Sequence, residues 1–322
     1  MKADFIISLD VGGTFVKGCV MENYGIIDGT FRQFAAKSDQ DKETILANFV
    51  NIILSLFENY KNEKLKKEET EVEPFKQKKR IGIGLAFPGP FDYKRGISYI
   101  RGLNKYDALY GVSVYEELTE RLKDTEISDA AEEITILFEN DARLFGLGAS
   151  TLYPMERLIC LTIGTGLGSV FIENGKMITE DERVPREGYL YNQLFQGVPV
   201  DDYFSRRGIL QSAAAENLLE GNEDVKELAN AAREGNKKAL KIFRRFGSEL
   251  GEMLIPHIER FKPDKIIIGG QIAKSFDLFG PSLSERLKPT GTNAVPLEDA
   301  LRFTHLGIAR LFDSREELGC RS

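Results

Sequence analysis

Leu9-Asp10-Val11-Gly12-Gly13-Thr14-Phe15-Val16, with Lys17 directly after it, is the segment from which the architecture of this chain can be inferred. The apolar runs around its glycines predict two short strands, at Phe5–Leu9 and Phe15–Met21, joined by a turn. Glycines let backbone N–H groups point toward one place and approach a bulky anion. The segment therefore indicates a phosphate-binding loop or, taken alone, a tight hairpin with an exposed Asp.

The polar residues of this segment suit a nucleotide. Thr14 adds a hydroxyl donor, and Lys17 adds a point charge that suits phosphate. Asp10 alone would repel phosphate, and its presence is explained if it holds Mg²⁺ through water, because Mg²⁺ keeps most of its water shell and takes few carboxylates. We therefore expect Asp10, Gly12, Gly13, Thr14 and Lys17 to bind the phosphates and the metal ion.

A second strand–glycine–strand unit occurs at Leu161–Val170, with Gly164-Thr165-Gly166-Leu167-Gly168 inside it. A dinucleotide-binding fold would need a helix after these glycines. Here a strand, Ser169–Ile172, and the hairpin signal Asn174-Gly175 follow instead. The pattern favours a second phosphate loop formed by Gly164, Thr165, Gly166 and Gly168, with a plain β-turn as the alternative.

Each half of the chain also contains a later strand that ends at glycine, Leu85–Gly89 in the first half and Ile266–Gly270 in the second. This internal repetition indicates two similar α/β lobes. Gly269-Gly270 leads from its strand into a helix, and such a junction can let a base or ribose lie against the backbone.

Asp141 is the candidate catalytic base. It follows the predicted strand Ile134–Phe138 and opens a helix of small residues, Ala142–Ser150, and open α/β sheets bind ligands at such strand ends. Phosphoryl transfer to an alcohol needs positioning, charge neutralisation and a base for the attacking hydroxyl. Asn140 can donate and accept hydrogen bonds, which suits a sugar hydroxyl. Alternatively, Asn140 or Asp141 caps the helix.

Further elements are predicted from periodicity and turn signals. We expect a third strand near Ile26–Phe34, a helix at Glu43–Phe57, a solvated helix end and loop at Lys61–Arg80, a helix that starts at Ser113, an apolar helical stripe from Ile242 to Ile258, and a last helix near Leu306–Phe312.

Composition excludes several classes of protein. The 322 residues suggest two domains at roughly 100–200 residues each. Lys and Arg number 43 against 50 Asp and Glu, giving a net charge of −7 without a basic stripe, so nucleic acid is not an expected partner. No signal-peptide layout and no apolar run near ~18 residues is present, so we expect a cytoplasmic protein without a membrane partner. Three widely spaced cysteines predict neither a disulfide framework nor a zinc site.

The glycine segment at residues 10–17, Glu139-Asn140-Asp141-Ala142 and the Leu161–Gly168 segment, in this order, resemble the ROK family of repressors, open reading frames and sugar kinases. Ile267-Ile268-Gly269-Gly270 fits the family's adenosine-side motif. The resemblance implies an α/β, two-lobed, actin-like ATPase fold (ribonuclease H-like) with a central cleft. We expect an N-terminal lobe of residues 1–139, joined by a C-terminal helix at 303–322, and a larger lobe of residues 140–302.

The resemblance also implies glucokinase-like phosphorylation of a hexose with ATP and Mg²⁺ as cofactors, in a homodimer. It makes Asp141 the base and Asn140 a sugar contact. Glu187 matches the sugar-binding Glu of the family's Gly-Glu-x-Gly-His motif, and Asp201 falls at a second sugar-binding Glu. Backbone near Gly89, and Asn104, are expected at the sugar as well. For Glu187 and Asp201 the alternatives are an exposed loop residue and a helix cap.

This chain departs from the family pattern at two places. Leu190 stands where the motif has His, and no cysteine lies between Cys160 and Cys320, so the zinc segment of many members is absent. The absence of both the His and the zinc segment changes the sugar pocket, so the resemblance does not identify glucose as the substrate. A kinase for an amino sugar or another hexose, or a non-catalytic sugar-binding sensor, remains an alternative. The family's repressors carry a DNA-binding segment before the first glycine loop; because Asp10 is the tenth residue here, we do not expect a repressor.

Overall fold

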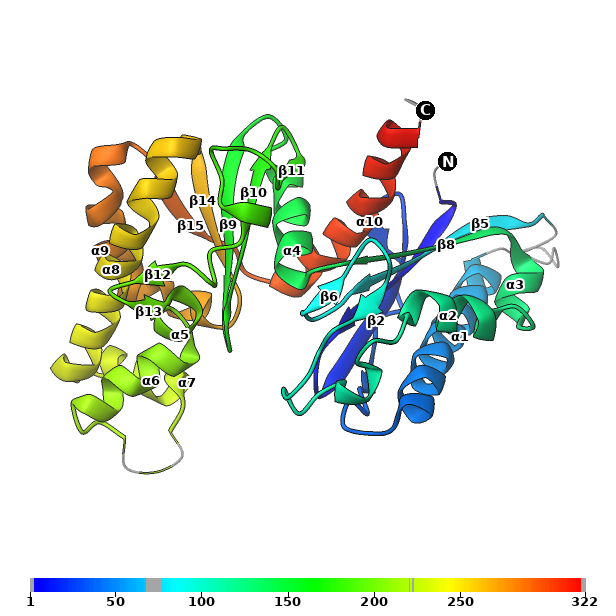
Figure 1. The fold of residues 1–322 in the computed structure, drawn as a ribbon, viewed down its shortest axis with the longest axis horizontal. Helices are drawn as coiled ribbons and strands as arrows, with labels where there is room; N and C mark the ends of the chain where they lie inside the picture. The colour runs from blue at the N-terminus through cyan, green and yellow to red at the C-terminus, as the bar shows by residue number, and fades with distance from the viewer. Residues whose placement is uncertain (1–2, 68–76, 220, 222, 320–322) are drawn as a thin grey trace. The chain divides into compact units, whose positions relative to one another are not determined.

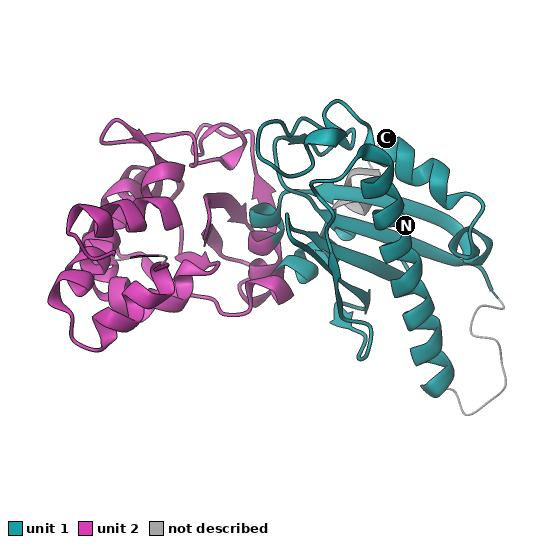
Figure 2. Cartoon of the chain, turned by 90° about the horizontal axis from the view of Figure 1, so that it is seen from below, with its two compact units in different colours: residues 1–144, 304–322 teal, residues 145–303 magenta. Residues whose placement is uncertain are grey.

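The structure is a computed structural model that describes residues 3–67, 77–219, 221 and 223–319 (Figure 1). It divides into two compact units, which are unit 1 (residues 1–144 and 304–322) and unit 2 (residues 145–303) (Figure 2). In the structure the boundaries between the units lie at 144/145 and 303/304, whereas the sequence predicted them at 139/140 and 302/303. Within the described ranges, no helix combines the length and the hydropathy that a bilayer crossing requires.

Unit 1 is built around one main sheet that begins with the first hairpin. Its elements are β1 (Phe5–Val11), β2 (Phe15–Glu22), β3 (Gly25–Ile26), β4 (Arg32–Ala35), α1 (Lys42–Lys67), β5 (Lys79–Ala86), β6 (Phe91–Asp92), β7 (Ile97–Ser98), η1 (Asp107–Leu109), α2 (Val114–Leu122), α3 (Glu126–Ala130), β8 (Ala131–Glu139), the start of α4 (Asp141–Ala149) and most of α10 (Ala300–Gly319). The main sheet has the order β3-β2-β1-β5-β8, and β4 also pairs with β2. β1 and β2 are antiparallel, as predicted, and β5 and β8 continue parallel to β1.

The single strand predicted near Ile26–Phe34 was wrong. The segment forms two short strands, β3 and β4, which pair with different parts of β2. Thr30 lies between them and is buried; its hydroxyl donates to the Ile27 carbonyl at 2.7 Å and accepts from the Val20 N–H at 3.0 Å. Gly29 before it has φ +80, a conformation that favours glycine, and lies in the turn between the two strands.

Helices cover both faces of the sheet of unit 1. Along β1, alternate residues face opposite sides: Leu9 packs in the cluster under α1, whereas Ile6 packs in the cluster under α10. β5 is buried along most of its length and lies close to α10 at Gly84. α1 continues to Lys67, beyond the predicted end at Phe57, while residues 68–76 of the predicted loop lie outside the described part of the chain.

Unit 2 repeats the sheet of unit 1. Its elements are the rest of α4, η2 (Ser150–Leu152), β9 (Arg157–Ile163), β10 (Leu167–Glu173), β11 (Lys176–Ile178), η3 (Arg186–Gly188), β12 (Leu194–Phe195), β13 (Val198–Pro199), α5 (Val200–Tyr203), α6 (Arg206–Ala215), α7 (Val225–Arg233), α8 (Lys237–Phe261), β14 (Lys265–Gly269), η4 (Ile272–Ser275), α9 (Phe276–Leu287), η5 (Lys288–Thr290) and β15 (Asn293–Pro296). The order β10-β9-β14-β15 matches β2-β1-β5-β8, with an antiparallel hairpin followed by two parallel strands. The internal repetition seen in the sequence is therefore a repeated topology.

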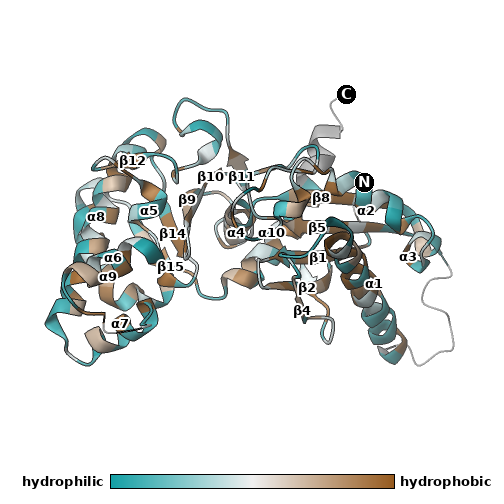
Figure 3. Cartoon of the chain, turned by 60° about the horizontal axis from the view of Figure 1, so that its bottom comes forward, coloured by the Kyte–Doolittle hydropathy of each residue, from teal (hydrophilic) through white to brown (hydrophobic). Residues whose placement is uncertain are grey.

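The core of unit 2 lies between its sheet and α6–α9. The strands of both sheets are hydrophobic along most of their length (Figure 3). The predicted stripe on α8 is buried there, including Phe243, Leu250 and Leu254. α4 covers the opposite face, and a Cβ on Gly146 would lie 2.1 Å from Val170 Cγ1, so this helix requires glycine to approach β10.

His257 on α8 is expected to make unit 2 sensitive to acid. Burial and the nearby charge of Arg260 lower the pKa of His257 to about 4, whereas the unfolded chain binds its proton near 6.5. The folded state therefore loses stability as the pH falls from 6.5 to 4, by about 2 kcal/mol after allowing for partial exposure of the ring. We expect His257→Gln to flatten this part of the curve of melting temperature against pH. Parallel curves for the two proteins would contradict the assignment.

Candidate active site

The turn between β1 and β2 is fixed through its carbonyl oxygens. The Gly12 carbonyl accepts from the Tyr106 hydroxyl at 2.8 Å, and the Gly13 carbonyl accepts from the Ser38 hydroxyl. The Thr14 carbonyl accepts a backbone N–H at 2.9 Å. Among the described residues, the N–H groups of Gly13 and Thr14 have no protein acceptor. This is the arrangement that an anion-binding turn requires.

Asp10 stands beside this turn and faces Lys17 across the hairpin. Burial raises the pKa of Asp10 to about 6, the negative charge of Asp141 adds to the rise, and Lys17 opposes it. The two carboxylates repel each other when both are ionised, and a divalent cation near them would remove that repulsion. A carboxylate next to a phosphate-binding turn fits the way in which Mg²⁺ is held, by one or two carboxylates together with phosphate oxygens and water.

Asn140, not Asp141, caps α4. The Asn140 Oδ1 accepts from the N–H of Ala142 at 3.0 Å and from that of Arg143 at 3.3 Å. Asp141 follows as the first helical residue and is exposed. Although part of the residue is exposed, the surrounding protein desolvates the carboxylate and so raises the pKa of Asp141, against the lowering effects of the Ala142 N–H and of the Lys105 charge. The structure thus assigns the capping role to the neighbour and leaves Asp141 at the end of β8.

The residues predicted to contact sugar in unit 1 lie in two places. The Asn140 amide donates to the Tyr93 hydroxyl at 3.4 Å, and a Cβ on Gly89 would lie 3.3 Å from the same oxygen. Gly89 and Asn140 therefore share one neighbour. Asn104 is exposed in the loop before η1 with φ +53, a conformation that Asn tolerates well.

The second glycine loop joins β9 and β10. The Gly164 N–H donates to the Gly166 carbonyl at 2.9 Å, and the Gly164 carbonyl accepts from the Arg206 N–H at 2.8 Å. Thr165 is exposed at its tip. Gly168 lies inside β10, opposite Thr162, so this glycine belongs to the strand and not to the loop.

Asp201 is bound to this loop. One of its oxygens accepts from the Leu167 N–H at 2.7 Å, and the other pairs with Arg207 at 2.6 Å. A Cβ on Gly166 would lie 2.5 Å from the Asp201 Oδ1, so the loop requires glycine there. Asp201 does not cap α5, whose cap position is Pro199.

Asp201→Ala is expected to weaken the binding of nucleotide more than that of sugar. Losing the acceptor for the Leu167 N–H frees the loop, and a hydrogen bond to a charged group is worth about 1.5–3 kcal/mol, so we expect the KM for ATP to rise about tenfold or more. Asp202→Ala is the matched control, because Asp202 pairs with the same Arg207 but not with the loop. An increase confined to the KM for sugar would instead support the sugar contact predicted from sequence.

Gly269 and Gly270 lie next to the second loop. Gly269 pairs with Thr162 at the end of β14, and a Cβ there would lie 2.4 Å from the ring of Phe145. Gly270 has φ +89, and a Cβ on it would lie 2.5 Å from the Ile163 carbonyl oxygen. The predicted nucleotide residues of unit 2 thus meet at one edge of its sheet.

Glu187 and Leu190 lie beside β10. Glu187 is half-buried in η3 with φ +59, and its N–H donates to the Thr179 carbonyl at 3.1 Å. Leu190 is fully buried in the core of unit 2, where an imidazole would lose its water contacts. Its N–H donates to the Ser169 hydroxyl at 2.8 Å, which in turn donates to the Gly188 carbonyl.

Sequence reasoning missed the side chains that hold the loops. Ser38, Tyr106 and Lys105 gather at the first glycine turn, and Arg207 holds Asp201 at the second. Ser38, Lys105 and Tyr106 belong to no motif, and Arg207 lies at an unspecified position of the family stretch that contains Asp201. The one available signal was that Lys105 and Tyr106 directly follow Asn104.

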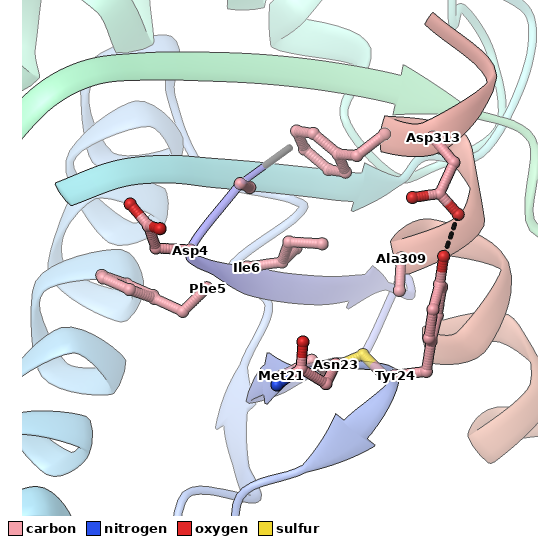
Figure 4. Close-up of a pocket in the computed structure, with 10 residues that line it drawn as sticks. Asp4, Phe5, Ile6, Met21, Asn23, Tyr24, Ala309 and Asp313 are labelled. Atoms are coloured by element: carbon pink, nitrogen blue, oxygen red, sulfur yellow. Dashed lines mark hydrogen bonds between the residues drawn. The ribbon is translucent and has the colours of Figure 1, made fainter. Parts of the chain in front are cut away.

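A small pocket lies at the opposite end of β1 from the glycine turn (Figure 4). Beside it the Tyr24 hydroxyl donates to Asp313. Its lining residues are Ala3, Asp4, Phe5, Ile6, Met21, Asn23, Tyr24, Ala309, Phe312 and Asp313. No predicted site residue is among them, so this pocket is separate from the candidate active site.

Solved structures share the fold. A glucokinase from Parabacteroides distasonis matches with a TM-score of 0.71 at 19% identity, over 97% of this chain and 98% of that one. A ROK family glucokinase from Streptomyces griseus, solved with glucose and AMPPNP, matches with a TM-score of 0.66 at 19% identity, over 95% and 98%. The chain has the α/β fold of the two-lobed, actin-like ATPases, as predicted.

The family model described as ROK family matches residues 6–302. The chain therefore belongs to the ROK family. It is 26% identical over 304 residues to a glucokinase from Thermotoga maritima, covering 86% of this chain and 85% of that protein. It is 25% identical over 305 residues to an N-acetyl-D-glucosamine kinase from Salmonella typhimurium, covering 86% and 87%.

Proposed function

We propose that this protein transfers the γ-phosphoryl group of ATP to a hydroxyl of a hexose, with Asp141 as the general base. One observation carries this proposal. Asn140 takes the cap of α4, which leaves the Asp141 carboxylate at a strand end, within electrostatic reach of Asp10 beside the glycine turn. If the only role of the Asp141 carboxylate were to cap the helix, neither the cap by Asn140 nor the nearby Asp10 would be needed.

The enzyme class rests on the family. The chain is an ATP-dependent sugar kinase, the class of the two curated relatives, which each match 86% of its length. The sheet edges support this class, because each unit presents a glycine turn or glycine pair at the ends of its central strands. The turn at Gly12-Gly13 and the loop at Gly164–Gly166 are our proposed contacts for the phosphates, and Gly269-Gly270 for the adenosine.

In this mechanism Asp141 takes the proton of the attacking hydroxyl. The sugar oxygen forms a bond to the γ-phosphorus while the bond from that phosphorus to the β-bridging oxygen breaks, and ADP leaves with the electron pair. The raised pKa of Asp141 makes its ionised form a stronger base than an ordinary carboxylate. Asp10 would hold Mg²⁺ through water, and the ion when bound would neutralise the charge that develops on the phosphates.

The sugar itself is the finer part of the proposal. Asn140, Gly89, Asn104 and Glu187 are the proposed sugar contacts. We propose that Asp201 instead supports the loop, because one of its oxygens accepts from the Leu167 N–H and the other pairs with Arg207. A hexose is favoured because the relatives named above act on glucose and on N-acetyl-D-glucosamine. An amino sugar is the second candidate on the same ground.

A panel of sugars in a coupled assay for ADP release tests this function. We expect one of glucose, N-acetylglucosamine or N-acetylmannosamine to stimulate ADP release at least a hundredfold over the rate without sugar. Binding of a sugar without ADP release would identify a sensor instead. Light scattering after size-exclusion chromatography would test the homodimer that the family resemblance implies, and cell fractionation would test the proposed cytoplasmic location.

A further inference from the structure

Lys105 is a charged residue of the site that no motif contains. It lies in the loop between β7 and η1 and is half-buried. A Cβ on Gly13 would lie 3.2 Å from the Lys105 Cδ and 3.7 Å from its Cβ. The aliphatic part of Lys105 therefore packs along the glycine turn, which brings its ammonium close to the place where that turn would hold an anion.

The loop that carries Lys105 is fixed to the same turn. The next residue, Tyr106, is fully buried; its N–H donates to the Ser38 carbonyl at 2.6 Å, and its hydroxyl donates to the Gly12 carbonyl at 2.8 Å. The Ser38 hydroxyl in turn donates to the Gly13 carbonyl. These bonds tie the backbone beside Lys105 to both glycines, so its position does not depend on the flexible side chain alone.

The charge of Lys105 reaches Asp141. It opposes the rise in the pKa of Asp141, whereas the corresponding effect on Asp10 comes from Lys17. The positive charge of Lys17 thus acts on Asp10, and that of Lys105 acts on Asp141. No carboxylate lies within ion-pair distance of the Lys105 ammonium in the part of the chain that the structure describes, so the turn and Asp141 are the features that explain its placement.

We propose that the Lys105 ammonium contacts the γ-phosphoryl group of ATP as it passes to the sugar oxygen. This inference rests on the proposed function. Charge moves onto the transferred group and the bridging oxygen as the bond to the β-phosphate breaks, and a cation held beside the base neutralises it there. The positive charge of Lys105 would also favour the ionised form of Asp141.

Lys105→Met, which keeps the length of the chain and removes the charge, tests the proposal. We expect kcat to fall about a hundredfold, with the KM for sugar changed less than threefold, and Lys105→Arg to recover at least tenfold of that loss. Lys123→Met is the matched control, because Lys123 is an exposed lysine at the C-terminal end of α2 that pairs with Glu120. Melting temperatures within about 2 °C of wild type would exclude a folding defect as the cause.

Binding without turnover separates this inference from the proposed function. By calorimetry with Mg²⁺, Lys105→Met should lose at least tenfold in affinity for the imido analogue of ATP and less than twofold for ADP, because only the triphosphate has a γ group. Equal losses for both nucleotides, or none, would overturn the role of Lys105 while wild-type kinase activity stood. A loss of affinity confined to sugars that carry their own carboxylate or phosphate would also overturn the proposed contact with the γ-phosphoryl group. It would instead assign Lys105 to binding of the substrate. Wild-type protein that binds no nucleotide would overturn the proposed function itself.

Discussion

Asp141→Asn is expected to lower kcat by about 10²–10⁴-fold, equivalent to roughly 3–5 kcal/mol of transition-state stabilisation. The amide is nearly the same size as the carboxylate but cannot take the proton of the attacking hydroxyl. Because Asn140 caps α4, the melting temperature should stay within about 1–2 °C of wild type. Steady-state kinetics with the best sugar of the panel, together with thermal unfolding, measure both quantities.

Asn140→Asp is the matched control for this experiment. Asp is as good a cap as Asn, so the helix should keep its stability, while the sugar contact changes and the KM for sugar rises. The acid limb of kcat/KM offers a second check, since activity that needs ionised Asp141 falls as the pH drops through its raised pKa. Near-normal turnover of Asp141→Asn would remove the base from the mechanism.

Gly84→Val is expected to destabilise unit 1 by about 3 kcal/mol, or roughly 10 °C in melting temperature. Gly84 lies in β5 against α10, and a Cβ there would lie 2.2 Å from the Ile308 Cγ2. The added side chain must push the helix away from the sheet. Thermal unfolding followed by circular dichroism measures the loss.

A second substitution tests whether this contact is the cause. Ile308→Ala opens space opposite Gly84, so the double variant should be more stable than the sum of the two single effects predicts. Gly25→Val is the control, because a Cβ on Gly25 meets its nearest atom at an ordinary 3.4 Å. Strict additivity of Gly84→Val and Ile308→Ala would show that α10 does not pack on β5 as described.

The sequence predicted best those features that depend on neighbours along the chain. The glycine turn at Gly12-Gly13, the hairpin at Asn174-Gly175 and the start of α2 at Ser113 follow from local backbone preferences, and the structure contains all three. The segment of Ile26–Phe34 was missed because a buried hydroxyl, Thr30, interrupts the strand through bonds to β2.

The candidate site was predicted as a set of motifs and not as a set of contacts. The role of Asn140 as cap was one of two open alternatives, and only the hydrogen bonds of its side chain decide between them. The engagement of Asp201 with Leu167 joins residues that lie far apart in sequence, as does the packing of Lys105 on Gly13. Such contacts arise from the arrangement of the sheets, which the pattern of residues does not specify.

The return of α10 to unit 1 has a consequence for biosynthesis. When the nascent chain has emerged from the ribosome as far as Phe303, every residue of unit 2 has been synthesised. The face of the first sheet that carries Ile6, Cys19 and Met21 still lacks the residues of α10 that pack against it, Ile308 and Phe312. The segment made first is thus the one completed last. Until α10 has been synthesised, this apolar face of the first sheet stays exposed to solvent and is available for chaperone binding.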